Sequence, residues 1–165
     1  MKAFREFVAR LSDACAVIAG VLLALAIAVI VYMIVRRFIG FSTDWELEFA
    51  VFMMVSSLFL GSPYCLKTEG HVAVGLLETA LSPQNAAWLR FATQVLGLAV
   101  VLFLAYLGYE KTLESFLQGE VTESSWAPPK WPLFATMPIG LGLTALQYIA
   151  LIELPFSSRR EQPNV

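Results

Sequence analysis

Four long apolar stretches, separated by short polar segments, dominate the hydropathy pattern of the chain. They cover residues 15–35, 47–66, 87–109 and 133–154. Each is about 20 residues long, which at about 1.5 Å per residue lets an α-helix cross a hydrocarbon core about 30 Å thick. We therefore predict an all-α membrane protein with four transmembrane helices in one domain, residues 1–165.

Two shorter stretches have helical periodicity but cannot cross a membrane. In the first twelve residues Phe4, Phe7, Val8 and Leu11 recur at i, i+3, i+4 and i+7. This spacing predicts an N-terminal amphipathic helix that lies in the membrane interface. Residues 68–80 have a similar pattern and predict an interfacial helix between spans two and three. Residues 110–130 are expected to form an extramembrane connection.

Small side chains follow one face of the first span at every fourth position: Ala16, Gly20, Ala24 and Ala28. Because lipid is as apolar as leucine, helices in a membrane associate through close packing at such residues. We call these four residues the small-residue stripe. It is expected to pack against another helix of the same chain or against a partner.

The connection between the first two spans carries turn and cap signals. Gly40 is expected to turn the chain after the first span. Thr43 and Glu46 have the spacing of a capping box, in which Thr43 caps the second helix and Glu46 is its third residue.

Glu48 lies just inside the second span, where a carboxylate must snorkel to the headgroups or meet a cation. Arg36 and Arg37, at the end of the first span, are the nearest cations in the chain. These residues and Glu46 have two interpretations, as headgroup anchors or as members of intersubunit salt bridges.

The composition is that of a polytopic membrane protein, with 58% hydrophobic residues, 15% charged residues and a mean hydropathy of +0.71. A net charge of -2 provides no basic field, which excludes nucleic acid as a partner. Cys15 and Cys65 lie in apolar segments, so neither a disulfide framework nor a zinc site is expected. Ala26-Ile27-Ala28 resembles a signal cleavage site, but the apolar run continues to Val35, which favours an uncleaved span.

Few residues could perform chemistry. The single histidine, His71, cannot ligate haem from both sides, and no cysteine or histidine partner is present for a metal site. Ser56 and Ser57 lie in mid-span and are expected to hydrogen-bond between helices. No ionisable residue lies near the middle of a span, where ion-coupled carriers usually have one. We therefore predict an accessory subunit that is not an enzyme and has no catalytic residue, cofactor or metal.

The distribution of basic residues predicts the orientation. One side of the membrane would hold Lys2, Arg5, Arg10, Lys67, Arg90, Arg159 and Arg160, and the other Arg36, Arg37, Lys111 and Lys130. The positive-inside rule then favours both termini in the cytoplasm.

Several short motifs, taken in order, resemble a known family. They are Trp45-Glu46-Leu47-Glu48 at the start of the second span, Phe59-Leu60-Gly61 late in it, Gly70-His71-Val72-Ala73-Val74 after it, and Trp131-Pro132 with Pro138-Ile139-Gly140 around the fourth span. Together they resemble the small integral-membrane subunit of tripartite ATP-independent periplasmic (TRAP) transporters over nearly the whole chain. The acidic residue usual shortly after the Gly-His pair is absent, because Gly75 stands there and Glu78 is the next carboxylate.

The resemblance implies a heterodimer with a large multi-span, elevator-type subunit in the bacterial inner membrane. Such systems are sodium-driven symporters that take up organic acids, including C4-dicarboxylates, sialic acids and sulfonates, from a periplasmic solute-binding protein. Substrate and sodium bind in the large subunit, and the small subunit widens the scaffold.

The resemblance also suggests contact residues. Gly70 would let the chain leave the second span, and His71 would anchor the interfacial helix at the membrane surface or at the partner. Partner or lipid contacts are expected at Arg36, Arg37, Trp45, Glu46, Glu48, Gly70 and His71. Trp45, Trp126 and Trp131 fit an interfacial belt, and residues 126–132 are an alternative contact for the binding protein.

Three other functions remain compatible with the residues alone. One is the small subunit of a tripartite tricarboxylate transporter, which also has four spans. Another is an autonomous homodimeric exporter, and the third is a membrane enzyme dependent on His71.

Overall fold

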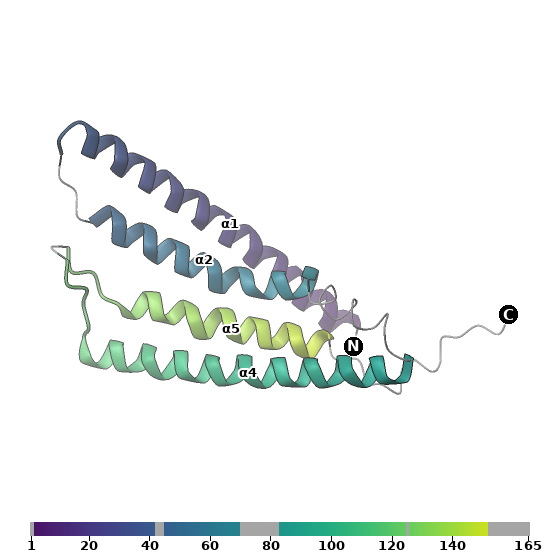
Figure 1. Cartoon of the computed structure of the whole chain (residues 1–165). Helices are drawn as coiled ribbons and strands as arrows, with labels where there is room; N and C mark the ends of the chain where they lie inside the picture. Colours follow the sequence, from purple (N-terminus) through teal and green to yellow (C-terminus); the bar gives the residue numbers. More distant parts are fainter. Residues whose placement is uncertain (1, 42–44, 70–82, 125, 152–165) are drawn as a thin grey trace.

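The computed structural model describes residues 2–41, 45–69, 83–124 and 126–151. Four helices account for most of them (Figure 1): α1 (Lys2–Phe38), α2 (Trp45–Glu69), α4 (Pro83–Gln118) and α5 (Trp131–Leu151). Each is long and apolar enough to cross a membrane. The predicted fold class, all-α with four spanning helices, is confirmed.

The helices lie side by side in the order α1, α2, α5, α4 (Figure 1). α1 packs along α2, α2 along α5, and α5 along α4. α1 also touches α5, but only near the start of α1, and the two diverge towards the other end of the molecule (Figure 1). The fold is therefore an open row of helices in which each helix leaves apolar side chains exposed.

The row has two distinct ends. At the termini end α1 begins and α5 finishes, and side chains from two helices cap the last carbonyls of α5. Arg5 Nε donates to Ala150 O at 2.7 Å, and Gln94 Nε2 donates to Leu151 O at 3.3 Å. These bonds satisfy backbone acceptors that a helix cannot satisfy itself. The opposite end carries Trp45, Trp126 and Trp131, and we call it the tryptophan end.

The N-terminal segment is the first part of α1, not a separate amphipathic helix as predicted. Val8 and Ser12 are buried within the row, whereas Phe4 and Phe7 are exposed. Ser12 Oγ donates to Val8 O at 3.0 Å, one helical turn back, so this serine is accommodated without a break. The helix therefore runs without interruption into the first span.

The buried face of α1 differs from the small-residue stripe. Its buried positions are Val8, Ser12, Cys15, Ala19 and Ala26. Spacings that alternate between four and three residues give the 3.5-residue repeat of helices that cross at about 20°.

The small-residue stripe runs alongside that face and is largely uncovered. Gly20, Ala24 and Ala28 are exposed, and Ala16 is half-buried. A Cβ added to Gly20 would meet nothing within 4 Å. Of the two predicted roles for the stripe, packing within the chain is therefore not observed among the residues that the structure describes.

α2 and α5 approach each other closely at Gly140. A Cβ added to Gly140 would overlap the backbone of Phe59 and lie 2.9 Å from its Cβ. Pro63 in α2 lacks the N–H that would bond to Phe59 O, and Ser62 Oγ donates to that carbonyl at 2.9 Å instead. Ser62 also shares a short hydrogen bond with Thr144 of α5.

α4 continues to Gln118, beyond the predicted span end at residue 109. Its last turns are held by polar pairs, since Lys111 Nζ lies 3.0 Å from Glu114 Oε2 and Gln118 Nε2 donates to Glu114 Oε1 at 3.3 Å. The ring of Phe116 packs edge-on against that of Trp131, with centroids 5.7 Å apart. The start of the predicted connection is thus helical.

Glycines end α1 and α4 in the same way. Gly40 has φ +90° and Gly119 has φ +62°. The N–H groups of each glycine and of the residue after it donate to carbonyls of the last turn, at 3.1–3.4 Å. This is the Schellman arrangement, and it confirms the turn predicted at Gly40.

The remaining boundaries are close to the prediction. Pro83 is the first residue of α4, and α5 begins two residues before the predicted span at 133. Of the predicted interfacial helix, residues 68 and 69 belong to the end of α2. The rest of it, with Gly70 and His71, lies outside the described residues, as does Thr43 of the predicted capping box.

Candidate functional site

Glu48, on the first turn of α2, binds the connection between α4 and α5 rather than an arginine. Its Oε2 accepts hydrogen bonds from Ser124 Oγ at 2.6 Å and Thr122 Oγ1 at 3.1 Å. Bonds to a carboxylate are among the stronger hydrogen bonds in proteins. Glu48 therefore holds residues 121–124 against the start of α2.

Arg36 and Arg37 do not pair with Glu48 within the described chain. Arg36 Nη1 donates to Tyr32 Oη at 3.2 Å, and its guanidinium lies 5.1 Å from the ring centroid of Phe41. That distance is in the cation–π range. Arg37 is exposed at the surface. The expected cation for Glu48 is thus replaced by two hydroxyl groups.

Glu46 has no exposed surface, and neither carboxyl oxygen has a hydrogen-bond partner in the part of the chain that the structure describes. It lies one helical turn before Ala50, which is also fully buried. Ser57 on the same face donates to Ala19 O of α1 at 2.8 Å, which confirms the predicted interhelical role of this serine. Glu46 therefore belongs to the face of α2 that packs on α1.

An aromatic cluster covers the tryptophan end. Trp45, Phe49 and Trp126 lie with ring centroids 6.1–6.3 Å apart in tilted or edge-on pairs. Trp45 and Trp126 remain 41% and 49% exposed, so both indoles are available to lipid headgroups or to another protein.

Lys111 links α4 to the connection that follows it. Its Nζ lies 3.3 Å from Glu120 Oε1. The hydrogen bond from Lys111 lowers the pKa of Glu120, despite partial desolvation. The resulting stabilisation is present above the ordinary pKa of glutamate and is lost as the pH falls through the lowered pKa.

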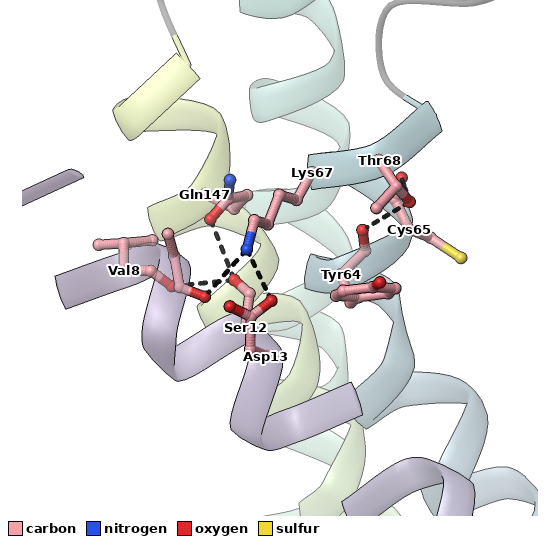
Figure 2. Close-up of polar contacts among 9 residues, drawn as sticks. Val8, Ser12, Asp13, Tyr64, Cys65, Lys67, Thr68 and Gln147 are labelled. Atoms are coloured by element: carbon pink, nitrogen blue, oxygen red, sulfur yellow. Dashed lines mark hydrogen bonds and ion pairs between the residues drawn. The ribbon is translucent and has the colours of Figure 1, made fainter. Parts of the chain in front are cut away.

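A second polar cluster lies at the termini end, between α1, α2 and α5 (Figure 2). Lys67 Nζ of α2 lies 2.6 Å from Asp13 Oδ1 and 3.5 Å from Ala9 O, both of α1. Ser12 Oγ lies 3.0 Å from Oε1 of Gln147 on α5, and both side chains are buried. These contacts fix the start of α1 to its two neighbours.

Sequence reasoning did not identify Ser12, Asp13, Thr122 or Ser124 as contact residues. Asp13 and Lys67 are of opposite charge and flank consecutive apolar spans, which in an antiparallel helix pair places them at the same end. That signal was available in the sequence. The hydroxyl partners of Glu48 carry no such signal, since they lie 74 and 76 residues away.

The side chains brought together at both ends bind one another or the backbone. Among the described residues, no group of three or more histidine, cysteine, aspartate or glutamate side chains could hold a metal ion. Cys15 and Cys65 are both free thiols. The arrangement connects helices and the loop between α4 and α5.

Comparison with known proteins identifies the family. Residues 25–154 match the family described as tripartite ATP-independent periplasmic transporters, DctQ component. No curated protein and no solved structure matches the chain. The matched region includes the aromatic and acidic start of α2 and the α2–α5 contact, and its description names a transporter component. The chain therefore belongs to the DctQ-component family of tripartite ATP-independent periplasmic transporters.

Proposed function

We propose that this chain is the small scaffold subunit of a sodium-driven TRAP transporter in the bacterial inner membrane. It would pair with a large elevator-type subunit and support uptake of organic acids that a periplasmic binding protein delivers. The family match over residues 25–154 carries the proposal. The match favours this role over a tricarboxylate-transporter subunit, an autonomous exporter or an enzyme.

The contacts of the described residues support a scaffold role. Buried Ser12 Oγ lies 3.0 Å from Gln147 Oε1, and the hydroxyl of buried Thr144 lies within hydrogen-bond distance of Ser62 Oγ and of Gly140 O. These polar groups are engaged in joining α1, α2 and α5. Substrate and sodium are then handled by the large subunit.

The exposed surfaces suggest where partners bind. We propose that the small-residue stripe of α1 packs against the large subunit, because none of the four described helices covers Gly20. Arg36, Arg37 and Trp45 are proposed to contact headgroups or a partner at the tryptophan end. Gly70 and His71 are proposed to contact lipid or a partner at the opposite membrane surface. Glu46 and Glu48 are proposed to take part in contacts within the chain.

Reconstitution tests this function. Proteoliposomes would contain this chain alone, the large subunit alone, or both, each with and without the binding protein and an inward sodium gradient. Uptake of radiolabelled C4-dicarboxylate, sialic acid and sulfonate is measured. We expect accumulation of one acid only when both membrane subunits, the binding protein and sodium are present.

Two results would contradict the proposal. Sodium- or proton-coupled flux through this chain alone would make it an autonomous carrier. Full uptake by the large subunit in the absence of this chain would remove its role as a scaffold. Co-purification of the two membrane subunits provides an independent measure of assembly.

A further inference from the structure

Each helix has a window free of charged residues that must be centred near the middle of the bilayer. The window is 14–35 in α1, 49–66 in α2, 91–109 in α4 and 131–151 in α5. A charged side chain at the centre of a spanning helix costs about 2.5–3.5 kcal/mol even on the lower scales. The positions of these windows therefore report how deep each helix lies.

Contacts between neighbouring helices show which residues lie at the same level of the row. Ser57 lies beside Ala19, and Lys67 beside Asp13, which aligns α2 with α1. Phe59 lies against Gly140, and Ser62 against Thr144, which aligns α2 with α5. Phe116 lies against Trp131, and Gln94 against Leu151, which aligns α4 with α5.

The window centres are displaced stepwise in one direction along the row. The centre of the α1 window, near Leu25, lies about 6 Å closer to the tryptophan end than the centre of the α2 window, at about 1.5 Å per residue. The centre of the α2 window in turn lies about 3 Å closer to the tryptophan end than the centre of the α5 window, which is near Leu141. The α4 centre, near Val100, lies about 7 Å from the α5 centre towards the termini end.

The displacement totals about 16 Å across a row that is three helix spacings of about 8–10 Å wide at the tryptophan end, where α1 has diverged from α5 (Figure 1). From this stepwise displacement we infer that the four uncharged windows, which together form the lipid-facing band of the chain, run obliquely across the row. The helices then cross the bilayer at about 30° to its normal, in the plane of the row, which is within the observed range of 0–40°.

An upright row would bury charges on both outer helices. At the termini end, the alignment places Asp13 and Lys67 level with Ala99, close to the centre of the α4 window. At the tryptophan end it places Glu110 level with Leu23, close to the centre of the α1 window. Tilting the row brings Asp13 and Lys67 to one membrane surface and Glu110 to the other, because α1 and α4 lie on opposite sides of the row (Figure 1).

The lipid bilayer therefore covers this oblique band, and the tilt of the row can be tested by measuring how deep single residues lie in the membrane. Ala14 and Ala99 are exposed residues at the same level of the row, on α1 and α4. Leu23 and Tyr109, 43% and 58% exposed, form a second level pair. Each is replaced by cysteine in the full chain carrying Cys15→Ala and Cys65→Ser, and is spin-labelled. The depth of each label is measured by its collision rates with oxygen and with a nickel chelate in phosphatidylcholine–phosphatidylglycerol vesicles.

The oblique arrangement predicts opposite results for the two pairs. Ala99 and Leu23 should lie near the midplane, while Ala14 and Tyr109 should be about 15 Å shallower, towards opposite membrane surfaces. Equal depths within each pair would show an upright row and overturn the inference. The reverse order, with Ala14 deeper than Ala99, would overturn it as well. Because all four positions are exposed, the variants are expected to fold, and either pair alone decides the question.

Discussion

At the scale of single residues, Gly140 determines how closely α5 approaches α2. The backbone of Phe59 occupies the space that a Cβ at residue 140 would need. A backbone cannot move aside as a flexible side chain can, so any larger residue must separate the two helices. Gly142, two residues later, has nothing within 4 Å of its Cβ position.

Gly140→Ala is therefore expected to destabilise the chain, and Gly142→Ala is its control. Overpacking of this kind costs about 1–3 kcal/mol. The measurement is the apparent Tm in detergent, followed by tryptophan fluorescence. We expect a decrease of several degrees for Gly140→Ala and none for Gly142→Ala. Equal Tm values for the two variants would show that the α2–α5 contact has room for a Cβ at residue 140.

Glu46 and Glu48 lie two residues apart on α2 and have opposite environments. Glu48 accepts two hydroxyl hydrogen bonds, whereas the carboxyl group of Glu46 is buried without a partner among the described residues. A buried polar group without a partner costs stability, while a satisfied one contributes to it.

Glu46→Met is accordingly expected to leave the Tm of the isolated chain unchanged or to raise it, because methionine keeps the length and removes the unsatisfied group. Glu48→Gln should lower the free energy of unfolding by about 1–2 kcal/mol, since hydrogen bonds to a charged acceptor are the stronger ones. Thermal unfolding in detergent compares the two. A lower Tm for Glu46→Met would show that the carboxyl group of Glu46 makes a stabilising contact.

At the scale of helices, α1 presents two faces with small side chains, and the described helices cover only one of them. Ala19 faces Gly61 of α2, where an added Cβ would lie 3.7 Å from Ala19 Cβ. Gly20, the next residue, belongs to the uncovered small-residue stripe. Ala19 thus takes part in packing within the chain, whereas its neighbour Gly20 belongs to the face that we propose packs against a partner.

Gly20→Leu should leave the Tm of the isolated chain close to that of wild type and reduce co-purification with the large subunit several-fold. Ala19→Leu should lower the Tm of the isolated chain, because its larger side chain enters the α1–α2 contact. Both are measured by thermal unfolding and by affinity capture of the tagged large subunit. Normal capture of Gly20→Leu would show that the stripe faces lipid.

The helices themselves could be predicted well from the sequence, but their packing faces could not. An apolar run of sufficient length and a glycine such as Gly40 act locally, so four spans and the first turn follow from the residues alone. The choice between Ala19 and Gly20 as the buried small residue depends on Ser57 and Gly61 of another helix. α4 extends past residue 109 because polar residues can also sustain a helix when they pair three or four positions apart.

At the scale of the whole molecule, the two ends of the row correspond to the two sets of basic residues that the sequence assigned to opposite sides of the membrane. Arg5 and Lys67 lie at the termini end, and Arg36 and Lys111 at the tryptophan end. This grouping is the one that the sequence predicted, and the positive-inside rule applied to it gives the predicted orientation with both termini in the cytoplasm.

Reporter fusions test that orientation. Green fluorescent protein at the C-terminus should fluoresce in cells, and alkaline phosphatase inserted after Gly119 should be active, because it folds only in the periplasm. Exchanging the two reporters is the control and should silence both. Active phosphatase at the C-terminus would reverse the orientation.

The unbroken course of α1 has a mechanical consequence. Contacts through Arg5, Ser12 and Asp13 hold its first turns against α2 and α5, while its distal end diverges from α5 (Figure 1). From Asp13 to Phe38 the helix measures about 38 Å at about 1.5 Å per residue. Because α1 also packs along α2, any force that the membrane or a neighbouring subunit applies near Phe38 is shared between that packing and the Asp13–Lys67 and Ser12–Gln147 contacts at the termini end.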